Sequence, residues 1–405
     1  MAESSGMGDA ALRSGNIGIM LCGLCALSEG IDLQAAGMAA AGIGAQFHPA
    51  PSLMGTFFSA STLGLFIGAL VAGRVADNIG RRTVLITSVF LFGGCSLLNA
   101  MAWNMPSLIA FRLLTGLGLG GALPMVLAYV SETSTPKWQR ASVALVYAMM
   151  PLGGALISLF SLLIAATEWR AFFMVGGIVP LLLTPLLLKS LPESKAFRQS
   201  KGESSMPPSR LSAVLADGRA GRTLLLWLSF FLELLLLYLL LNWLPTLLLA
   251  RGATRGEAAF AQIGFNLGGV ITSLAIGVAL DGRLRSAAII TTFIAVPVLL
   301  VVLARADVEP MGLFGIVLLL GCAVLSAQAY LYASAPGLYP VSIRGMGAGA
   351  AVAAGRIGSF VGPQLGGILK SAGHDTPQLL MDILPLVIAG SVASLTFAWV
   401  TRRPT

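Results

Sequence analysis

The chain alternates between long apolar runs and short polar connections along its whole length. Runs of about 20 apolar residues match the length of a helix that crosses the hydrocarbon core of a bilayer. We expect twelve such runs to form transmembrane helices, at residues 17–45, 53–72, 83–102, 107–130, 141–166, 170–190, 222–249, 258–280, 286–304, 311–334, 345–369 and 379–400. The pattern therefore predicts an all-α integral membrane protein.

Composition and charge agree with this class of protein. The chain is 56% hydrophobic and only 10% charged, whereas soluble domains carry about 25% charged residues. Its formal net charge of +8 would suit nucleic acid, but the basic residues concentrate in alternate connections, as at Arg81, Arg82 and Arg344. Cytoplasmic loops are the ones enriched in Lys and Arg. We therefore expect both termini in the cytoplasm, the bilayer as surroundings, and no nucleic-acid partner.

Two similar loops divide the chain into halves. G-R-V-A-D-N-I-G-R-R at 73–82 and G-V-A-L-D-G-R-L-R at 277–285 both read G-x-x-x-D followed by basic residues. Each loop follows the second predicted helix of its half, as expected for a duplicated transporter fold. This repeat predicts two pseudo-symmetric six-helix halves, 1–190 and 222–405, joined by a polar cytoplasmic linker at 191–221.

The first apolar run contains two acids, Glu29 and Asp32, which are three residues apart and project from one helix face. One carboxylate at mid-bilayer costs roughly 2.5 to 3.5 kcal/mol, which packing alone does not require. Either both acids lie at the water interface at a span end, or they form a buried, protonatable pair facing a polar cavity, which we favour. Arg112, inside the fourth run, is their natural counter-ion, with snorkelling to the outer interface as its alternative.

Other polar and aromatic residues lie inside the predicted spans. Arg356, deep in the eleventh run, is hard to explain by packing, and we expect a cation facing a cavity. Glu233 has two open interpretations, a third titrating group or a side chain at the inner interface. An aromatic ligand needs flat apolar walls, and the candidates for these walls and for polar contacts are Tyr147, Tyr238, Asn242, Trp243, Gln328, Tyr330 and Tyr332.

The loop at 73–82 resembles the signature loop of the major facilitator superfamily. E-G-I-D at 29–32 resembles the paired-acid motif of the aromatic acid–proton symporters within that superfamily. The resemblance covers essentially the whole chain and implies two halves that rock about a mid-membrane site. It also implies a network of gating residues on the cytoplasmic side, namely Gly73, Asp77, Arg81, Glu132, Arg140 and Arg344.

The resemblance implies proton-coupled import of a small hydroxylated aromatic acid, such as a hydroxyphenylpropionate, across a bacterial inner membrane. A carboxylate in low dielectric needs a cation, and Arg112 or Arg356 can provide a bidentate one. Glu29 and Asp32, with Arg112, would couple protons to transport. We expect protons as the coupling ion, no cofactor, no catalytic activity and a monomer. An exporter of drugs or metabolites on the same fold and a substrate sensor without transport remain as alternatives.

Overall fold

The computed structural model describes residues 2–135, 138–191, 211–281, 285–305, 309–340 and 343–401, without the side chains of 2–16, 140, 211 and 276–281. Within those ranges the chain is helical and contains no strand. Its long helices are α1 Ala2–Phe47, α2 Pro51–Ile79, α3 Arg81–Ala100, α4 Met105–Thr133, α5 Gln139–Phe160, α6 Arg170–Ser190, α8 Ala220–Ala250, α9 Arg255–Asp281, α10 Arg285–Arg305, α11 Pro310–Ser334, α12 Arg344–Ser371 and α13 Thr376–Val400. Short 3-10 helices, η1 Leu211–Val214 and η2 Ala335–Leu338, accompany them.

The twelve predicted spans fall on these twelve helices, one span to each helix. Eleven of the described helices are long and apolar enough to cross a membrane. Helix α12 does not reach that hydropathy, since its sequence holds many glycines together with Arg344 and Arg356. It nevertheless packs against both α8 and α2 inside the bundle. The prediction of an all-α, twelve-helix membrane protein is therefore confirmed.

The connections follow local chemistry that the sequence carries. Gly80 separates α2 from α3 with a φ of 99°, a region that glycine enters without steric cost. Asn104 caps α4, because its side chain accepts a hydrogen bond of 2.8 Å from the backbone N–H of Ser107. Asp375 caps α13 in the same way through the N–H of Gln378, also at 2.8 Å.

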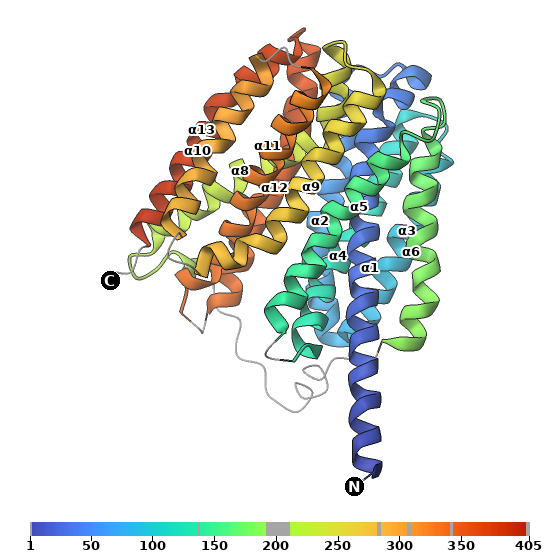
Figure 1. Ribbon diagram of the computed structural model, residues 1–405, viewed down its shortest axis with the longest axis vertical. Coiled ribbons are helices and arrows are strands. Elements are labelled where there is room, and N and C mark those ends of the chain that lie inside the picture. The colour runs from blue at the N-terminus through green and yellow to red at the C-terminus, as the bar shows by residue number, and fades with distance from the viewer. Residues whose placement is uncertain are drawn as a thin grey trace.

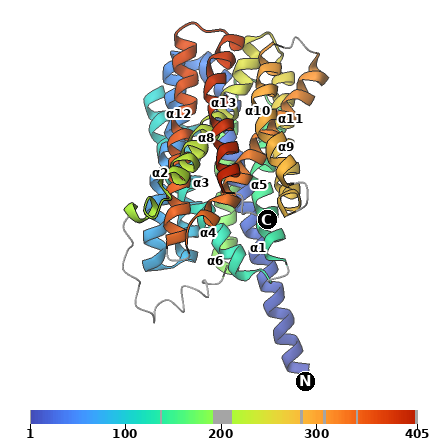
Figure 2. The same cartoon turned by 90° about the vertical axis from the view of Figure 1, so that its left-hand side faces the viewer.

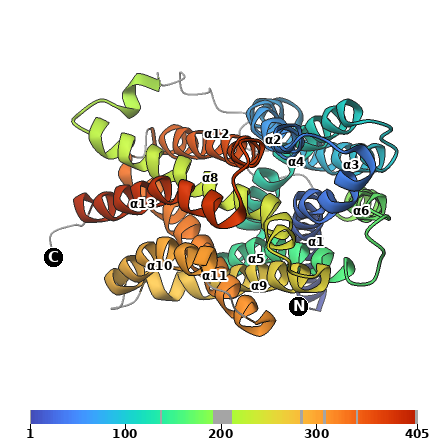
Figure 3. The same cartoon turned by 90° about the horizontal axis from the view of Figure 1, so that it is seen from above.

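The helices form two groups with the same internal pairing. In the N-terminal group α1, α2 and α3 pack against α5, α4 and α6, and in the C-terminal group α8, α9 and α10 pack against α12, α11 and α13. The two groups lie side by side when the bundle is viewed from above (Figure 3). Equivalent pairings in equivalent order are what a duplicated fold produces. Because residues 192–210 lie outside the described ranges, the boundaries 1–190, 191–221 and 222–405 stay a prediction.

The two ends of the bundle differ. We call the end where α2 meets α3 at Gly80 and α12 begins the basic end, and the end where α1 meets α2 the far end. The basic end is at the bottom of Figure 1, where the ribbons of the two groups diverge and the start of α1 projects below the bundle (Figures 1 and 2). The groups meet through α2 with α12 and α5 with α9.

Hydrogen bonds join the two groups at the far end. The backbone N–H of Ser52 donates to Ser371 Oγ at 2.8 Å, and Arg255 Nη1 donates to the carbonyl oxygen of Ile164 at 2.6 Å. Trp243 Nε1 donates to the carbonyl oxygen of Pro363 on α12 at 2.8 Å, while its ring packs edge-on against Phe58 of α2 at 5.2 Å. The two groups of helices are therefore joined at the far end, and their ribbons diverge towards the basic end (Figure 1).

Candidate functional site

Two acidic residues lie near the middle of the apolar part of α1, Ile17–Phe47. Both side chains are buried, since Glu29 is 2% exposed and Asp32 is 0% exposed. The structure therefore does not place them at a span end, where the interfacial interpretation requires them. Neighbouring Ser28 is turned to its own helix and donates to the carbonyl oxygen of Cys25 at 2.8 Å.

Asp32 faces the N-terminal group and has polar partners there. Arg112 Nη1 of α4 donates to Asp32 Oδ2 at 2.9 Å, and both side chains are at most 1% exposed. Ser96 Oγ of α3 donates to Asp32 Oδ1 at 2.6 Å. The Arg112 guanidinium also lies 5.9 Å from the ring centre of Phe57 and 5.7 Å from that of Phe173, close enough for cation–π attraction. Arg112 is thus a buried counter-ion and does not snorkel to an interface.

Glu29 faces a different cation. Its strongest electrostatic interaction with another charged group is with Arg356 of α12, in the other group of helices. Arg356 in turn donates from Nη1 to the hydroxyl of Tyr238 at 3.0 Å. The sequence suggested Arg112 as the partner of both acids, but in the structure each acid has its own arginine. Asp32 is neutralised within the N-terminal group, and Glu29 interacts across the boundary between the groups.

A cavity lies between the two groups beside Arg356. Four residues of its lining were expected from the sequence, namely Tyr147, Tyr238, Gln328 and Tyr332. Three further polar residues of the lining were not expected, namely Gln34, Asn266 and Ser273. The rings of Tyr147 and Tyr332 lie 6.4 Å apart across the boundary between the groups. The walls between the polar side chains are apolar, and include Leu33, Leu237 and Leu325. A cation, aromatic rings and apolar walls therefore meet in one place.

The cavity volume is about 90 Å³. Sites for small ligands typically enclose about 300–1,000 Å³. In this conformation the cavity is therefore smaller than an aromatic acid, and side chains or helices must move apart before one enters.

Three residues that we expected in the substrate site lie elsewhere. Trp243 forms part of the far-end junction described above. Asn242 donates from Nδ2 to the carbonyl oxygen of Tyr238 in its own helix, at 2.8 Å. Tyr330 is buried with its ring 5.7 Å from that of Phe293 on α10. None of the three lines the cavity beside Arg356.

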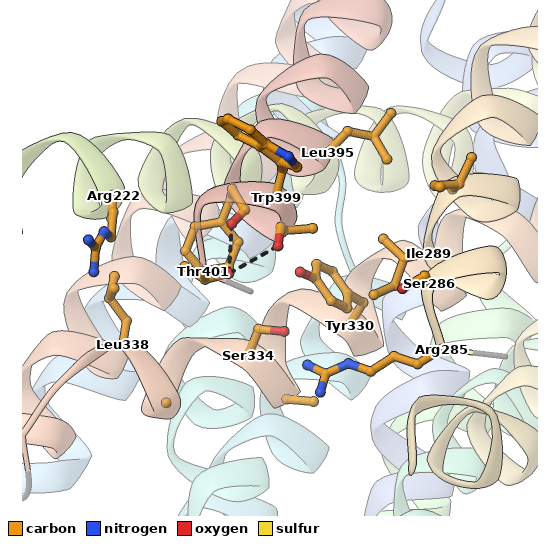
Figure 4. A pocket seen from close by; sticks show the side chains of 15 residues that line it. Arg222, Arg285, Ser286, Ile289, Tyr330, Ser334, Leu338, Leu395, Trp399 and Thr401 are labelled. Carbon is orange, nitrogen blue, oxygen red and sulfur yellow. Dashed lines mark hydrogen bonds between the residues drawn. The ribbon is translucent and has the colours of Figure 1, made fainter. Parts of the chain in front are cut away.

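Tyr330 lies instead beside a second, larger cavity at the basic end of the C-terminal group, with a volume of about 990 Å³. Helices α8, α10, α11 and α13 border this cavity, and its polar lining includes Arg222, Arg285 and Ser334 (Figure 4). Trp399, 72% exposed, lies at its edge (Figure 4). Its lining residues all come from the C-terminal group, so it is separate from the cavity between the groups.

Glu233 is buried within the C-terminal group at 8% exposure, so it does not face water at the inner interface. It lies on α8, about one turn before Leu237, which lines the cavity between the groups. Its Oε1 has no hydrogen-bond partner in the described part of the chain. An uncompensated buried carboxylate is costly, which is consistent with a neutral, protonated side chain.

The expected gating residues cluster at the basic end. Arg81 at the start of α3 forms an ion pair with Glu132 near the end of α4. Gly73 and Asp77 are exposed on the last turns of α2, and Arg344 is exposed at the start of α12. The side chain of Arg140 and the loop of the second repeat, 282–284, lie outside the described part of the structure.

Sequence reasoning missed a group of three carboxamides. Gln34 of α1 forms hydrogen bonds with both Gln262 and Asn266 of α9. The signal was available, because Gln262 and Asn266 lie four residues apart on one helix face inside an apolar span. Gln34 lies two residues from Asp32 in the apolar run of α1, where a carboxamide also needs a polar partner.

Comparisons with known proteins agree with this architecture. A model of the Major Facilitator Superfamily matches residues 22–363. The 3-(3-hydroxy-phenyl)propionate transporter of Escherichia coli K12 is 41% identical over 95% of this chain and 94% of its own length. The 4-hydroxybenzoate transporter PcaK and a gallate transporter, both of Pseudomonas putida, are each 32% identical, over 90% and 96% of this chain and 88% and 92% of their own lengths.

Solved structures share the fold. A D-xylose–proton symporter matches with a TM-score of 0.74 at 18% identity, covering 94% of this chain and 96% of its own. The E. coli xylose transporter XylE in a partially occluded inward-open conformation matches with a TM-score of 0.75 at 16% identity, covering 97% and 99%. These likenesses concern the fold alone.

Proposed function

The chain belongs to the major facilitator superfamily, and from this premise we propose that it imports a small aromatic carboxylate together with protons by alternating access. The substrate class rests on the cavity between the groups and on relatives named for hydroxylated aromatic acids. The compound that we propose is a hydroxylated phenylpropionate. The hydrogen bonds of the far-end junction support a conformation that is closed at that end.

The observation that carries the proposal is that Arg356 lines the cavity and also interacts electrostatically with Glu29. A substrate carboxylate that binds Arg356 takes the place of Glu29 as its counter-ion. Two carboxylates beside one guanidinium repel each other, so binding of the anion favours uptake of a proton by Glu29. Substrate and proton then enter the site together. This is the physical origin of the proposed coupling.

Asp32 is the second carboxylate of the proposed coupling set. In this conformation Arg112 neutralises it, and the pair ties α1 to α4 within the N-terminal group. Arg356 lines the cavity and Arg112 does not. Arg356 is therefore the cation available to a substrate. We therefore assign substrate binding to Arg356 rather than to Arg112.

The energetics of the proposed import depend on charge. Basic side chains gather at the end that we propose to be cytoplasmic, in a bacterial inner membrane with both termini inside. Moving an anion inward against an inside-negative potential costs roughly 2.3 kcal/mol per 100 mV. One accompanying proton cancels that cost, and a second makes uptake follow the potential.

The test is binding of 3-(3-hydroxyphenyl)propionate to the purified protein and to an Arg356→Ala variant. A hydrogen bond to a charged group contributes about 1.5–3 kcal/mol, so affinity should fall by about 10- to 150-fold. Arg356→Lys should recover part of the loss, since it keeps the charge but not the bidentate geometry. Arg305→Ala, at an exposed arginine at the end of α10, is the matched control. Equal affinity in the wild type and Arg356→Ala would remove Arg356 from the site.

A further inference from the structure

Three buried carboxamides meet where α1 of the N-terminal group faces α9 of the C-terminal group. Gln34, Gln262 and Asn266 are each at most 4% exposed. Gln34 Oε1 accepts hydrogen bonds from Gln262 Nε2 at 2.8 Å and from Asn266 Nδ2 at 2.9 Å. Gln34 Nε2 donates in return to Asn266 Oδ1. The cluster thus spans the boundary between the two groups.

The carboxamides have more hydrogen-bonding capacity than they use among themselves. Each amide nitrogen carries two donors and each amide oxygen two acceptor sites. Gln34 Nε2 uses one donor on Asn266, whose Oδ1 keeps a second acceptor site. Both residues line the cavity beside Arg356, whereas Gln262 is not among the lining residues. The two lining carboxamides therefore hold one unused donor and one unused acceptor site, the pair that a phenolic hydroxyl requires.

The amides of Gln34 and Asn266 line the same cavity as Arg356. Arg356 interacts electrostatically with Glu29 of α1. Gln34 follows five residues later on α1, which is a rise of about 7.5 Å along the helix. Leu33 and Tyr147 are among the apolar and aromatic residues that line the cavity with them. A cation, apolar and aromatic walls and two carboxamides in one cavity match an aryl acid with a polar ring substituent.

A glycine of α5, Gly154, leaves room for the amides of Gln34 and Asn266. A Cβ atom at Gly154 would lie 2.2 Å from Gln34 Nε2 and 2.6 Å from Asn266 Oδ1. These distances are far below van der Waals contact, so the two carboxamides lie directly against the bare backbone of α5. Any larger residue at position 154 would displace the two carboxamides or the backbone of α5.

We propose that Gln34 and Asn266 bind the ring hydroxyl of the substrate and select hydroxylated aryl acids over unsubstituted ones. The proposal rests on the proposed function and adds to it the part of the substrate that is recognised. An unsubstituted ring would press against these amides without offering them a hydrogen bond. Sites built to bind a hydroxyl group discriminate strongly against analogues that lack it.

The experiment compares affinities for two ligands, 3-(3-hydroxyphenyl)propionate and 3-phenylpropionate, by calorimetry on the purified protein. The wild type should prefer the hydroxylated acid by about 2- to 12-fold, as one neutral hydrogen bond implies. In Gln34→Leu and Asn266→Leu the preference should fall towards one, with affinity for 3-phenylpropionate kept or improved. Gly154→Ala should also lower the preference, although it removes no polar group.

Gln364→Leu is the matched control, because Gln364 is a carboxamide on α12 that meets Thr56 of α2 across the same boundary, at 3.3 Å. This variant should keep the wild-type preference. If Gln34→Leu and Asn266→Leu change both affinities by the same factor, the amides only hold the two groups together and the proposal is overturned. If the wild type binds neither acid, the proposed function itself fails. Unfolding temperatures of every variant separate loss of fold from loss of selectivity.

Discussion

Removing Arg112 should destabilise the protein strongly, because it strands Asp32 in an apolar interior. The two charges are 2.9 Å apart and at most 1% exposed. At that distance, with an effective dielectric constant of about 20, their Coulomb attraction is about 6 kcal/mol. Desolvation of both ions offsets much of it, and breaking a buried pair by removing one partner typically costs about 3–5 kcal/mol. We expect that loss in the free energy of unfolding of Arg112→Met.

The double variant separates the pair from the packing of its side chains. Asp32→Asn with Arg112→Met removes both charges, leaving Ser96 to donate to the amide oxygen of the new side chain. It should therefore be more stable than Arg112→Met alone, by about 2 kcal/mol or more, since contacting residues couple at up to about 3 kcal/mol. Methionine keeps most of the volume between Phe57 and Phe173.

The cycle compares four proteins: the wild type, Arg112→Met, Asp32→Asn and the double variant. Their free energies of unfolding are measured by reversible unfolding in mixed micelles with increasing sodium dodecyl sulfate. An Arg112→Met variant that loses less than about 1 kcal/mol would refute the reasoning. So would effects of the two single changes that simply add in the double variant. Either result would mean that the pair is solvated or replaceable, and that burial does not make it costly to break.

Further predictions concern packing, gating and coupling. Gly116→Ala should lower the free energy of unfolding by about 1–3 kcal/mol, because a Cβ atom there would lie 2.1 Å from the carbonyl oxygen of Ser61; the same unfolding titration measures it. Glu132→Gln should change that free energy by less than about 1 kcal/mol, as its pair with Arg81 is partly exposed, yet slow transport in a counterflow assay. Asp32→Asn should abolish uphill accumulation in proteoliposomes while counterflow persists; normal accumulation would remove Asp32 from the coupling set.

The helices could be predicted because apolar length is a local property of the sequence. Twelve runs gave twelve helices, even for α12, whose glycines and arginines lower its hydropathy. The boundaries were less certain, and α1 extends to Ala2, well before its apolar run begins. The number and order of the helices were therefore accessible without a structure.

The pairing of charges could not be predicted, because it depends on helices far apart in the sequence. Glu29 and Asp32 project from one face of α1, but α1 lies at the boundary between the groups. Asp32 forms an ion pair with Arg112, whereas Glu29 interacts electrostatically with Arg356. Sequence spacing placed the acids together without indicating that different helices would contact them.

Tyr330 shows what helical spacing alone could have indicated. Gln328 and Tyr332 are four residues apart on α11 and line the same cavity, as the i, i+4 rule requires. Tyr330 lies two residues from each and therefore points to the other side of the helix, against Phe293. Tyr330 therefore lines the cavity at the basic end (Figure 4), whereas Gln328 and Tyr332 line the cavity between the groups.

The most direct test of the coupling account is substrate uptake by proteoliposomes under an inward proton gradient, with the membrane potential held at zero. The wild type should accumulate 3-(3-hydroxyphenyl)propionate above its external concentration. Glu29→Gln should bind and exchange the substrate but only equilibrate it, because the carboxylate that interacts with Arg356 and takes up the proton is gone. Accumulation by Glu29→Gln to the wild-type level would contradict the account.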